Sequence, residues 1–195
     1  MSSLYTRRGD EGLADACMGD RTPKDDAIFD ALGTVDELQC VIGVARCHLR
    51  SCKLDADCSG RLQEVLESLQ KDLSQYVCVS MLPSFFSAPG KAEALCSALK
   101  SATERVERTI DELHTSPLHE FVLPGASGCL AAVQLHVCRT VCRRAERAVV
   151  HLLHGDNKVA VEMPVALKKE LLSFINRCSD LLFAAALFVD KHDQV

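Results

Sequence analysis

The stretch that decides the fold is residues 121–150, FVLPGASGCLAAVQLHVCRTVCRRAERAVV. Its first five residues cannot continue a helix, because they end in a proline without an amide donor and a glycine that favours a turn. Ser127 or Gly128 can cap the run that follows, which has about six helical turns and contains neither Gly nor Pro. The pattern predicts a long helix over 128–150.

The predicted helix has two different faces. Arg139, Arg143 and Arg147 recur at every fourth residue on one side. His136 lies in line with them, and Glu146 lies beside them. The row is either a solvated basic face with Glu146 as a helix pair or a polyphosphate site, because planar Arg groups bind phosphate oxygens bidentately. The other side is expected to be apolar and consists of Val137, Cys138, Val141, Cys142, Ala145, Ala148 and Val149.

The bulk composition is that of one ordinary globular domain covering residues 1–195. Hydrophobic residues make up 48% of the chain, charged residues 25%, and the formal net charge is -5. A nucleic-acid-binding protein normally carries a basic excess, so we expect no nucleic-acid partner. The basic row is therefore local and needs a local explanation.

The cysteine pattern favours free thiols. The chain has 11 cysteines but no CxxC pair. Cys47, His48, Cys52 and Cys58 lie close together, but their gaps do not match the common zinc spacings. The sequence thus identifies no metal ligands, and we expect an intracellular, reducing location.

Two further features bear on location. The first residues, MSSLYTRRGDEG, carry charges and no apolar core, which argues against a signal peptide. The apolar segment 171–189 contains Asn176, Arg177 and Asp180, so we expect no membrane span.

Apolar residues recur with a helical period in four further segments, and the chain is predicted to be all-α, a five-helix bundle of ferritin-like type. Asp36, in the middle of the first helix, is a candidate to face the arginine row. The Glu-x-x-His motif of di-iron bundles is absent. The four segments are 26–49, 60–82, 90–114 and 164–190.

The N-terminal segment has neither a helical nor a strand period. Glycines interrupt a run of charges there, which is typical either of a disordered terminus or of a loop that surrounds a phosphate with amides and cations. It is not a Walker loop, because no GK[ST] follows. The residues available for phosphate are Thr6, Arg7, Arg8, Gly9 and Lys24.

Six motifs occur in an order and at spacings that resemble one known family: YTRRGDEG, KDD, ALGTVDELQCVIGVA, FVLPG, CRTVCRRAERAVV and INRCSDLLF. Together they resemble the PduO-type ATP:cob(I)alamin adenosyltransferases. The resemblance covers the chain from about Leu4 to Phe188. It implies a cobalamin adenosyltransferase-like bundle assembled as a homotrimer, with active sites between subunits.

The implied reaction moves the 5′-deoxyadenosyl group of ATP to the cobalt of cob(I)alamin and releases triphosphate, with Mg²⁺ and the cations stabilising the leaving group. The resemblance implies that residues 1–26 wrap ATP through Thr6, Arg7, Arg8, Gly9 and Lys24. The alternatives are an adenosylcobalamin carrier or a nucleotide-binding bundle without turnover.

The family's remaining roles fall on the helices. The resemblance assigns the triphosphate to Arg143 and Arg147 with Glu146 nearby, and the completion of the nucleotide pocket to Asn176. It pairs Asp36 with Arg139 across the subunit boundary. Phe121 would press on the lower face of the corrin and keep cobalt without its axial base, which makes reduction to cob(I)alamin easier.

One departure from the family pattern concerns the N-terminal loop, where small hydroxyl residues are usual and this chain has Leu13, Ala14 and Asp15. An ionised Asp15 repels phosphate unless a metal lies between them, and Arg8 can offset this loss. Further expectations are a cobalamin reductase and an adenosylcobalamin-dependent mutase as partners. The expected compartment is the mitochondrial matrix in a eukaryote and the cytoplasm otherwise.

Overall fold

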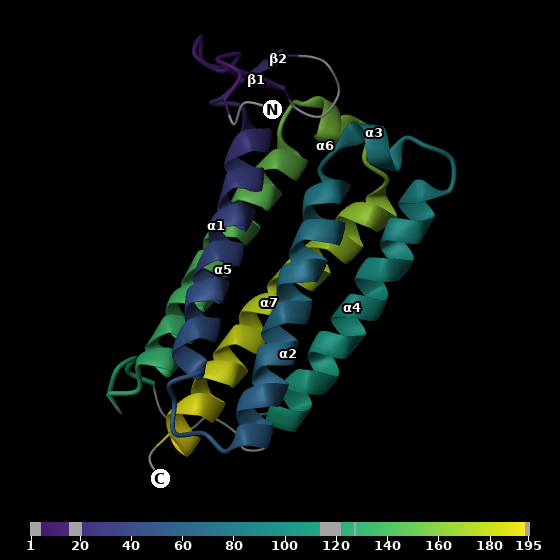
Figure 1. Cartoon of the computed structure of the whole chain (residues 1–195). Coiled ribbons are helices and arrows are strands. Elements are labelled where there is room, and N and C mark those ends of the chain that lie inside the picture. Colours follow the sequence, from purple (N-terminus) through teal and green to yellow (C-terminus); the bar gives the residue numbers. More distant parts are fainter. Residues whose placement is uncertain (1–4, 16–20, 114–121, 127, 194–195) are drawn as a thin grey trace.

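The computed structural model describes residues 5–15, 21–113, 122–126 and 128–193. Within these residues five long helices form an elongated bundle (Figure 1). The prediction of an all-α five-helix bundle is confirmed. Two short helices, α3 (Pro83–Phe86) and α6 (Lys158–Glu162), lie together at one end. The long helices are α1 (Ala27–Leu49), α2 (Ala56–Asp72), α4 (Lys91–Leu113), α5 (Leu130–His154) and α7 (Val165–His192).

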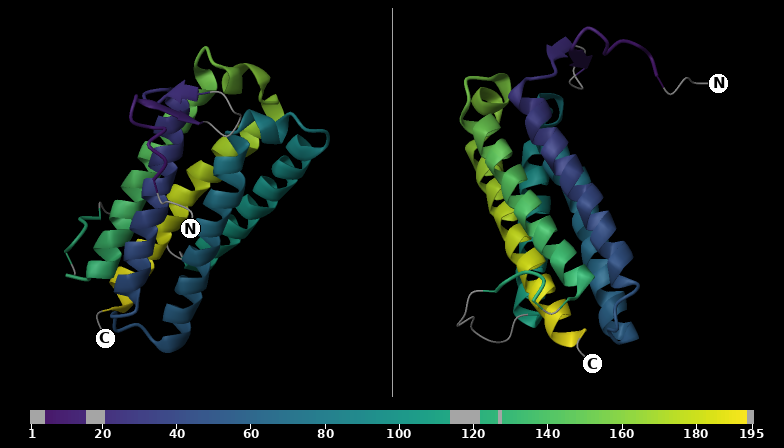
Figure 2. Two further views of the ribbon diagram at one scale, coloured as in Figure 1. Left: turned by 45° about the horizontal axis from the view of Figure 1, so that its top comes forward. Right: turned by 90° about the vertical axis from the view of Figure 1, so that its left-hand side faces the viewer.

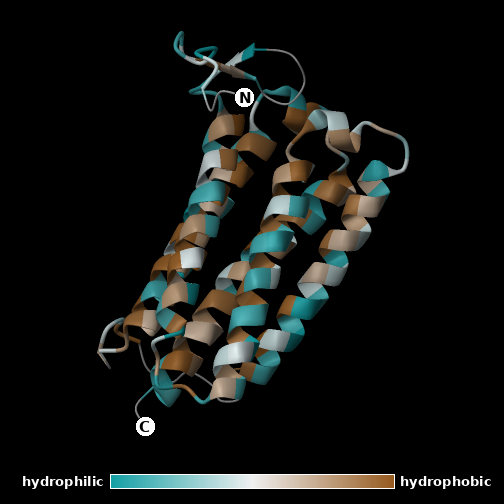
Figure 3. Cartoon of the chain, viewed as in Figure 1, coloured by the Kyte–Doolittle hydropathy of each residue, from teal (hydrophilic) through white to brown (hydrophobic). Residues whose placement is uncertain are grey.

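Helix α5 occupies the middle of the packing, between α1 and α7, and α4 packs on another side of α7. Hydrophobic and hydrophilic residues alternate along the long helices (Figure 3), as expected when each helix buries one face. Of the seven α5 residues predicted to be apolar-facing, Val137 is 39% exposed and the other six are buried. The predicted period is therefore correct, and Val137 lies at the edge of the buried face.

Among the described residues, helix α7 is the one whose length and composition would suffice to cross a membrane. However, 56% of its most apolar window is buried inside the bundle. Phe174, Leu171 and Leu182 are fully buried in the shared core. Packing against α4 and α5 thus accounts for the hydrophobicity of this helix.

Several helix boundaries differ from the sequence-based prediction. Asp55 caps α2 by accepting from the backbone N–H of Cys58 at 2.9 Å, so this helix begins at Ala56 rather than near residue 60. It continues into a π-helical segment, η1 (Leu73–Cys78). The N-cap of α5 is Cys129, and the prediction of Gly128 as the cap is wrong; Ser127 lies outside the described residues.

The N-terminal segment contains a small antiparallel hairpin that the sequence did not predict. Strand β1 (Leu13–Asp15) pairs with β2 (Arg21–Pro23) in the register Ala14↔Thr22. The hairpin lies at the end of the bundle where α1 begins and α5 ends (Figure 2). A strand period escapes detection here because each strand has only three residues.

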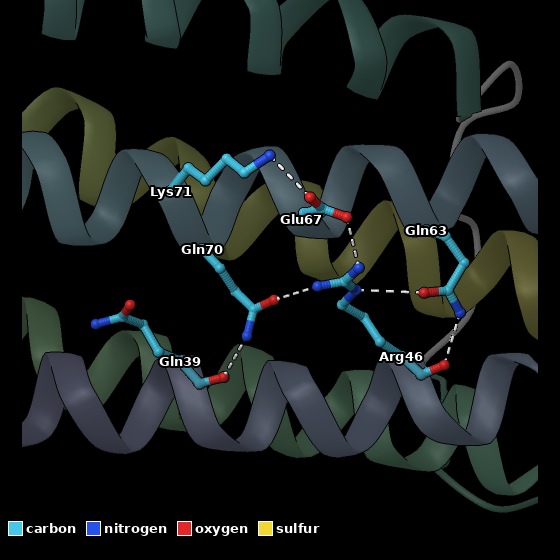
Figure 4. A network of polar contacts seen from close by, with 6 residues as sticks. All are labelled: Gln39, Arg46, Gln63, Glu67, Gln70 and Lys71. Carbon is cyan, nitrogen blue, oxygen red and sulfur yellow. Dashed lines mark hydrogen bonds and ion pairs between the residues drawn. The ribbon is translucent and has the colours of Figure 1, made fainter.

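A polar network joins α1 to α2 (Figure 4). The guanidinium of Arg46 donates to Gln63 at 3.2 Å, to Gln70 at 2.8 Å and to Glu67 at 2.8 Å. Gln63 donates back to the carbonyl of Arg46 at 2.6 Å, and Gln70 donates to the carbonyl of Gln39 at 2.8 Å. The α1–α2 contact is therefore held largely by satisfied polar groups, including one half-buried charge.

Candidate functional site

The arginine row lies on α5 as the sequence predicted, and its two C-terminal members are open to solvent. Arg143 and Arg147 are both exposed. Arg147 donates to the backbone carbonyl of Arg143 at 3.1 Å. Within the part of the chain that the structure describes, neither guanidinium has a carboxylate partner. Two adjacent cations without counter-charges form a surface that favours an anion with several oxygens.

The N-terminal part of the row is different, because His136 is buried and Arg139 is half-buried. His136 is only 5% exposed, so the prediction that it lines the polar side is wrong. Burial first, and then the charge of Arg139, lower the pKa of His136. The guanidinium carbon of Arg139 lies 5.3 Å from the ring centre of Phe183, a cation–π contact. Its Nε is buried and has no hydrogen-bond partner among the described residues.

Glu146 and Asn176 bring α5 and α7 together beside the exposed arginines. The side-chain amide of Asn176 donates to Oε1 of Glu146 at 3.0 Å. The sequence-based prediction had assigned both residues to the nucleotide pocket, and the fold brings them into direct contact. Glu146 lies between Arg143 and Arg147 in the sequence. The hydrogen bond from Asn176 orients its carboxylate and leaves the second oxygen available to another partner.

Asp36 does not pair with Arg139 among the described residues of one chain. Its side chain is exposed, and it contributes, after desolvation, to raising the pKa of Cys78 in η1 to about 11. The ion pair that joins α1 to α5 is instead formed by the neighbouring residues Glu37 and Arg144. The predicted pairing of Asp36 with Arg139 across a subunit boundary stays a prediction.

The N-terminal cations are organised by the hairpin. Lys24 donates through Nζ to the carbonyl of Gly9 at 2.8 Å, and Arg21 donates to the carbonyl of Arg8. A Cβ added at Gly9 would lie 2.9 Å from Nζ of Lys24, so a side chain here would displace the lysine. Arg21 was missed in the sequence-based prediction, although its charge three residues before Lys24 was visible.

Two more of the predicted N-terminal residues adjoin the same turn. Thr6 accepts through Oγ1 from the backbone N–H of Arg8 at 3.5 Å. Arg7 has a positive φ of 59° and lies over the ring of Tyr5, 5.7 Å from its centre. The turn lines a cavity of about 190 Å³ formed by Thr6, Arg8, Gly9, Leu13, Ala14, Asp15 and Arg21.

The acidic residue that departs from the family pattern has a counter-charge. Arg8 and Asp15 form an ion pair of 3.2 Å, with 64% and 42% of their side chains exposed. At such exposure the pair contributes little to stability. It does reduce the negative field that Asp15 would present to a phosphate. The expected compensation of Asp15 by Arg8 in ATP binding stays a prediction.

The predicted cobalamin-contacting residue, Phe121, lies outside the described residues. The chain that follows it, Val122 to Ala126, forms a turn in which Gly125 has a φ of 92°. Such a φ strains any residue with a Cβ, so a glycine is needed at this position. Phe121 itself stays a prediction from the resemblance.

Comparison with known proteins agrees with the motifs. The sequence model of the family described as cobalamin adenosyltransferase matches residues 4–189. Corrinoid adenosyltransferase MMAB of Mus musculus is 34% identical over 188 residues, which cover 95% of this chain and 71% of that protein. A corrinoid adenosyltransferase of Citrobacter freundii is also 34% identical over 188 residues, covering 95% of this chain and 94% of that protein.

Solved structures give the same result for the fold. A variant of the PduO-type ATP:corrinoid adenosyltransferase from Lactobacillus reuteri, complexed with cobalamin and ATP, matches with a TM-score of 0.77 at 27% identity, over 98% of this chain and 93% of that one. Another variant of that enzyme, complexed with ATP, matches with a TM-score of 0.72 at 29% identity, over 98% and 96%. The chain therefore belongs to the cobalamin adenosyltransferase family.

Proposed function

We propose that this protein transfers the 5′-deoxyadenosyl group of ATP to the cobalt of cob(I)alamin and releases triphosphate. The observation that carries the proposal is the pair Arg143 and Arg147, exposed on α5 without a carboxylate partner among the described residues and lying within the segment matched by the family. A triphosphate carries several negative charges, and two guanidinium groups one helical turn apart suit it.

The reaction needs little covalent chemistry from the protein. Cobalt(I) is the nucleophile: it attacks C5′ of the ribose, a Co–C bond forms, the C5′–O bond breaks and its electron pair leaves with triphosphate. The protein's contribution is to position ATP and to stabilise the charge of the leaving group. Arg143 and Arg147 hold the phosphates in this account, and Thr6, Arg7, Arg8, Gly9 and Lys24 surround the nucleotide.

The residues present also fit a magnesium ion that accompanies ATP. Mg²⁺ takes one or two carboxylates together with phosphate oxygens and water. Glu146 supplies one such carboxylate, and Asn176 fixes its orientation at 3.0 Å. When bound, the ion would neutralise phosphate charge; Glu146 would hold it beside the two arginines.

We infer that the complete site forms between subunits of a homotrimer. The cavity beside the N-terminal hairpin, about 190 Å³, is smaller than the usual ligand pocket of about 300–1,000 Å³. No hydrogen bond or ion pair among the described residues joins this hairpin to Arg143 or Arg147. Arg139 forms no ion pair among the described residues, and Asp36 is an exposed carboxylate. A neighbouring subunit that brings Asp36 to the guanidinium of Arg139 would pair the two charges.

The lower face of the corrin is assigned to Phe121 on the resemblance alone. Phe121→Ala is expected to slow the reaction mainly when cob(II)alamin must first be reduced, because an apolar group that excludes the axial base favours the reduction. Rates measured from cob(II)alamin with a reductant and from prereduced cob(I)alamin separate the two steps. Equal loss on both routes would contradict the axial-ligand role.

The reductase, the mutase and the compartment stay predictions. We expect an intracellular protein, mitochondrial in a eukaryote and cytoplasmic otherwise, that receives electrons from a cobalamin reductase and delivers its product to a mutase.

The test of the proposed function is anaerobic mixing of the protein with chemically reduced cob(I)alamin, ATP and Mg²⁺. We expect the cob(I)alamin absorption band to disappear and a light-sensitive alkylcobalamin to form repeatedly, with one triphosphate released for each. A nucleotide-binding bundle would bind ATP without any spectral change. A carrier would retain adenosylcobalamin tightly and would not turn over.

A further inference from the structure

Three potential metal ligands meet at the end of the bundle opposite the N-terminal hairpin. The loop after α1, the start of α5 and the end of α7 converge there (Figure 1). They bring Cys52, Cys129 and Asp193 together, and one ligand atom from each lies within 4.8 Å of the others. The two cysteines are 77 residues apart in sequence, so spacing alone could not reveal the cluster.

The distance between the two sulfur atoms distinguishes two possible uses of the pair. Sγ of Cys52 lies 3.9 Å from Sγ of Cys129. A disulfide requires about 2.05 Å. A tetrahedral zinc ion with Zn–S bonds of about 2.3 Å holds its two sulfur ligands about 3.8 Å apart. The separation is that of a thiol–thiol hydrogen bond, and it also matches the spacing of two sulfur ligands on one tetrahedral ion.

The third ligand is held in place by the backbone. The N–H of Lys53, next to Cys52, donates to Oδ1 of Asp193 at 2.8 Å. Hydrogen bonds that orient a ligating carboxylate in this way are typical of metal centres. Cys129 is 4% exposed, whereas Cys52 and Asp193 are half-buried, so an ion can enter from the side of the latter two.

The two thiols and the carboxylate of the cluster differ in their protonation. Burial first, and then Cys129, raise the pKa of Cys52 to about 12, and burial also raises the pKa of Cys129. Hydrogen bonding to the N–H of Lys53 lowers the pKa of Asp193, so this carboxylate is ionised at neutral pH. A divalent cation therefore has to displace two thiol protons when it binds, so its binding releases protons.

We propose that Cys52, Cys129 and Asp193 bind one zinc ion, with water as the fourth ligand. Two thiolates and one carboxylate suit Zn²⁺ and its spectroscopic substitute Co²⁺, and they exclude the oxygen-preferring Mg²⁺ and Ca²⁺. The ion would join the ends of three helices at the opposite end from the proposed nucleotide site.

The test is a titration of the metal-free, reduced full-length protein with Co²⁺ under anaerobic conditions. We expect one equivalent to bind, with the visible bands of tetrahedral Co²⁺ and a near-ultraviolet sulfur-to-cobalt band of the intensity that two thiolates give. Zn²⁺ should displace it. Zn²⁺ at 100 times its Kd should also raise the Tm by roughly 5–10 °C.

Variants separate this cluster from the other thiols. Cys52→Ser should weaken binding more than about 100-fold, because even the loss of an outer hydrogen-bond partner costs about 10–100-fold. Asp193→Asn should shift affinity in the same direction while keeping both thiolate contributions to the sulfur band. Cys58→Ser is the matched control, because Cys58 lies in the same region but pairs with Asp55; it should bind Co²⁺ like the wild type. Arg143→Ala should also bind Co²⁺ normally, which separates this site from the proposed function.

Three results would overturn the proposal. The first is a titration without a sulfur-to-cobalt band. The second is equal loss of binding in Cys58→Ser and Cys52→Ser. The third is a Cys52–Cys129 disulfide, identified by peptide mass in protein prepared without reductant, together with no metal binding after reduction.

Discussion

Two groups of arginines in this bundle differ in whether their side chains have partners within the chain. Arg46, between α1 and α2, directs all three guanidinium nitrogens at side-chain oxygens of α2, at 2.8–3.2 Å. Arg143 and Arg147, on α5, are exposed and have no carboxylate partner among the described residues. An arginine whose donors are satisfied within the chain stabilises the fold. An exposed arginine without a carboxylate partner, called an open arginine below, is available to a ligand.

The largest expected effect is on activity, at the open arginines. Arg143→Ala should lower kcat/KM for adenosyl transfer by about 10²–10³-fold, the usual loss when one preorganised donor to a developing negative charge is removed. Helix content and Tm should change little, because the side chain is exposed. Arg61→Ala is the control, since Arg61 is exposed but paired with Glu112. If both variants lost activity equally, the distinction between open and paired arginines would fail.

The same contrast shows which features of the fold and of the candidate site the sequence could predict. Helical periodicity predicted the five long helices and the position of the arginine row, because an apolar face must be buried. It could not show that His136 is buried and Arg143 exposed, since that depends on which neighbours α5 meets. The hairpin strands were too short to carry a period, and Asp55 moved the start of α2 by a local cap.

Sequence spacing could not predict the contacts between residues that lie far apart in the chain. The Arg46 network connects residues 17–24 apart on two helices, and Cys52 meets Cys129 across 77 residues. The Glu146–Asn176 contact follows the family resemblance, which assigned both residues to one pocket. The resemblance therefore grouped two residues that spacing alone did not connect, and their role in a nucleotide pocket stays a prediction.

The second effect is on stability, at the satisfied arginine. Arg46→Ala should lower the free energy of unfolding by about 2 kcal/mol, because it removes charge-assisted hydrogen bonds from a half-buried seam. Chemical denaturation measures the loss. ATP affinity of the folded variant should equal that of the wild type. If Arg46→Ala changed the ATP affinity but not the free energy of unfolding, Arg46 would be a ligand-binding residue, and the structural role assigned to it would be wrong.

A smaller effect, on the KM for ATP, is expected at Asn176, which is hydrogen-bonded to Glu146 beside the open arginines. Asn176→Ala should raise the KM for ATP about fivefold, since it removes one hydrogen bond, of about 1 kcal/mol, that orients Glu146 beside the open arginines. Steady-state kinetics at saturating cob(I)alamin measure this. Because Asn176 is exposed, Tm should change little. An unchanged KM would mean that Glu146 needs no orientation.

The smallest effect concerns the buried member of the row. The pKa of His136 is lowered by burial and by Arg139, so the folded state favours the neutral ring. As the pH falls below about 6.5, the unfolded chain takes up this proton more readily than the folded one, and stability decreases. His136→Leu should make the free energy of unfolding less dependent on pH between about 5 and 6.5. Identical pH profiles for the variant and the wild type would contradict the assignment.

The most direct measurement is calorimetric binding of inorganic triphosphate, the proposed product, to the wild type and to Arg143→Ala, Arg61→Ala and Arg46→Ala at fixed salt. The account predicts one triphosphate per site, binding lost in Arg143→Ala, and wild-type affinity in the two variants of paired arginines. Wild-type affinity in Arg143→Ala would contradict the claim that the open arginines of α5 hold the phosphates.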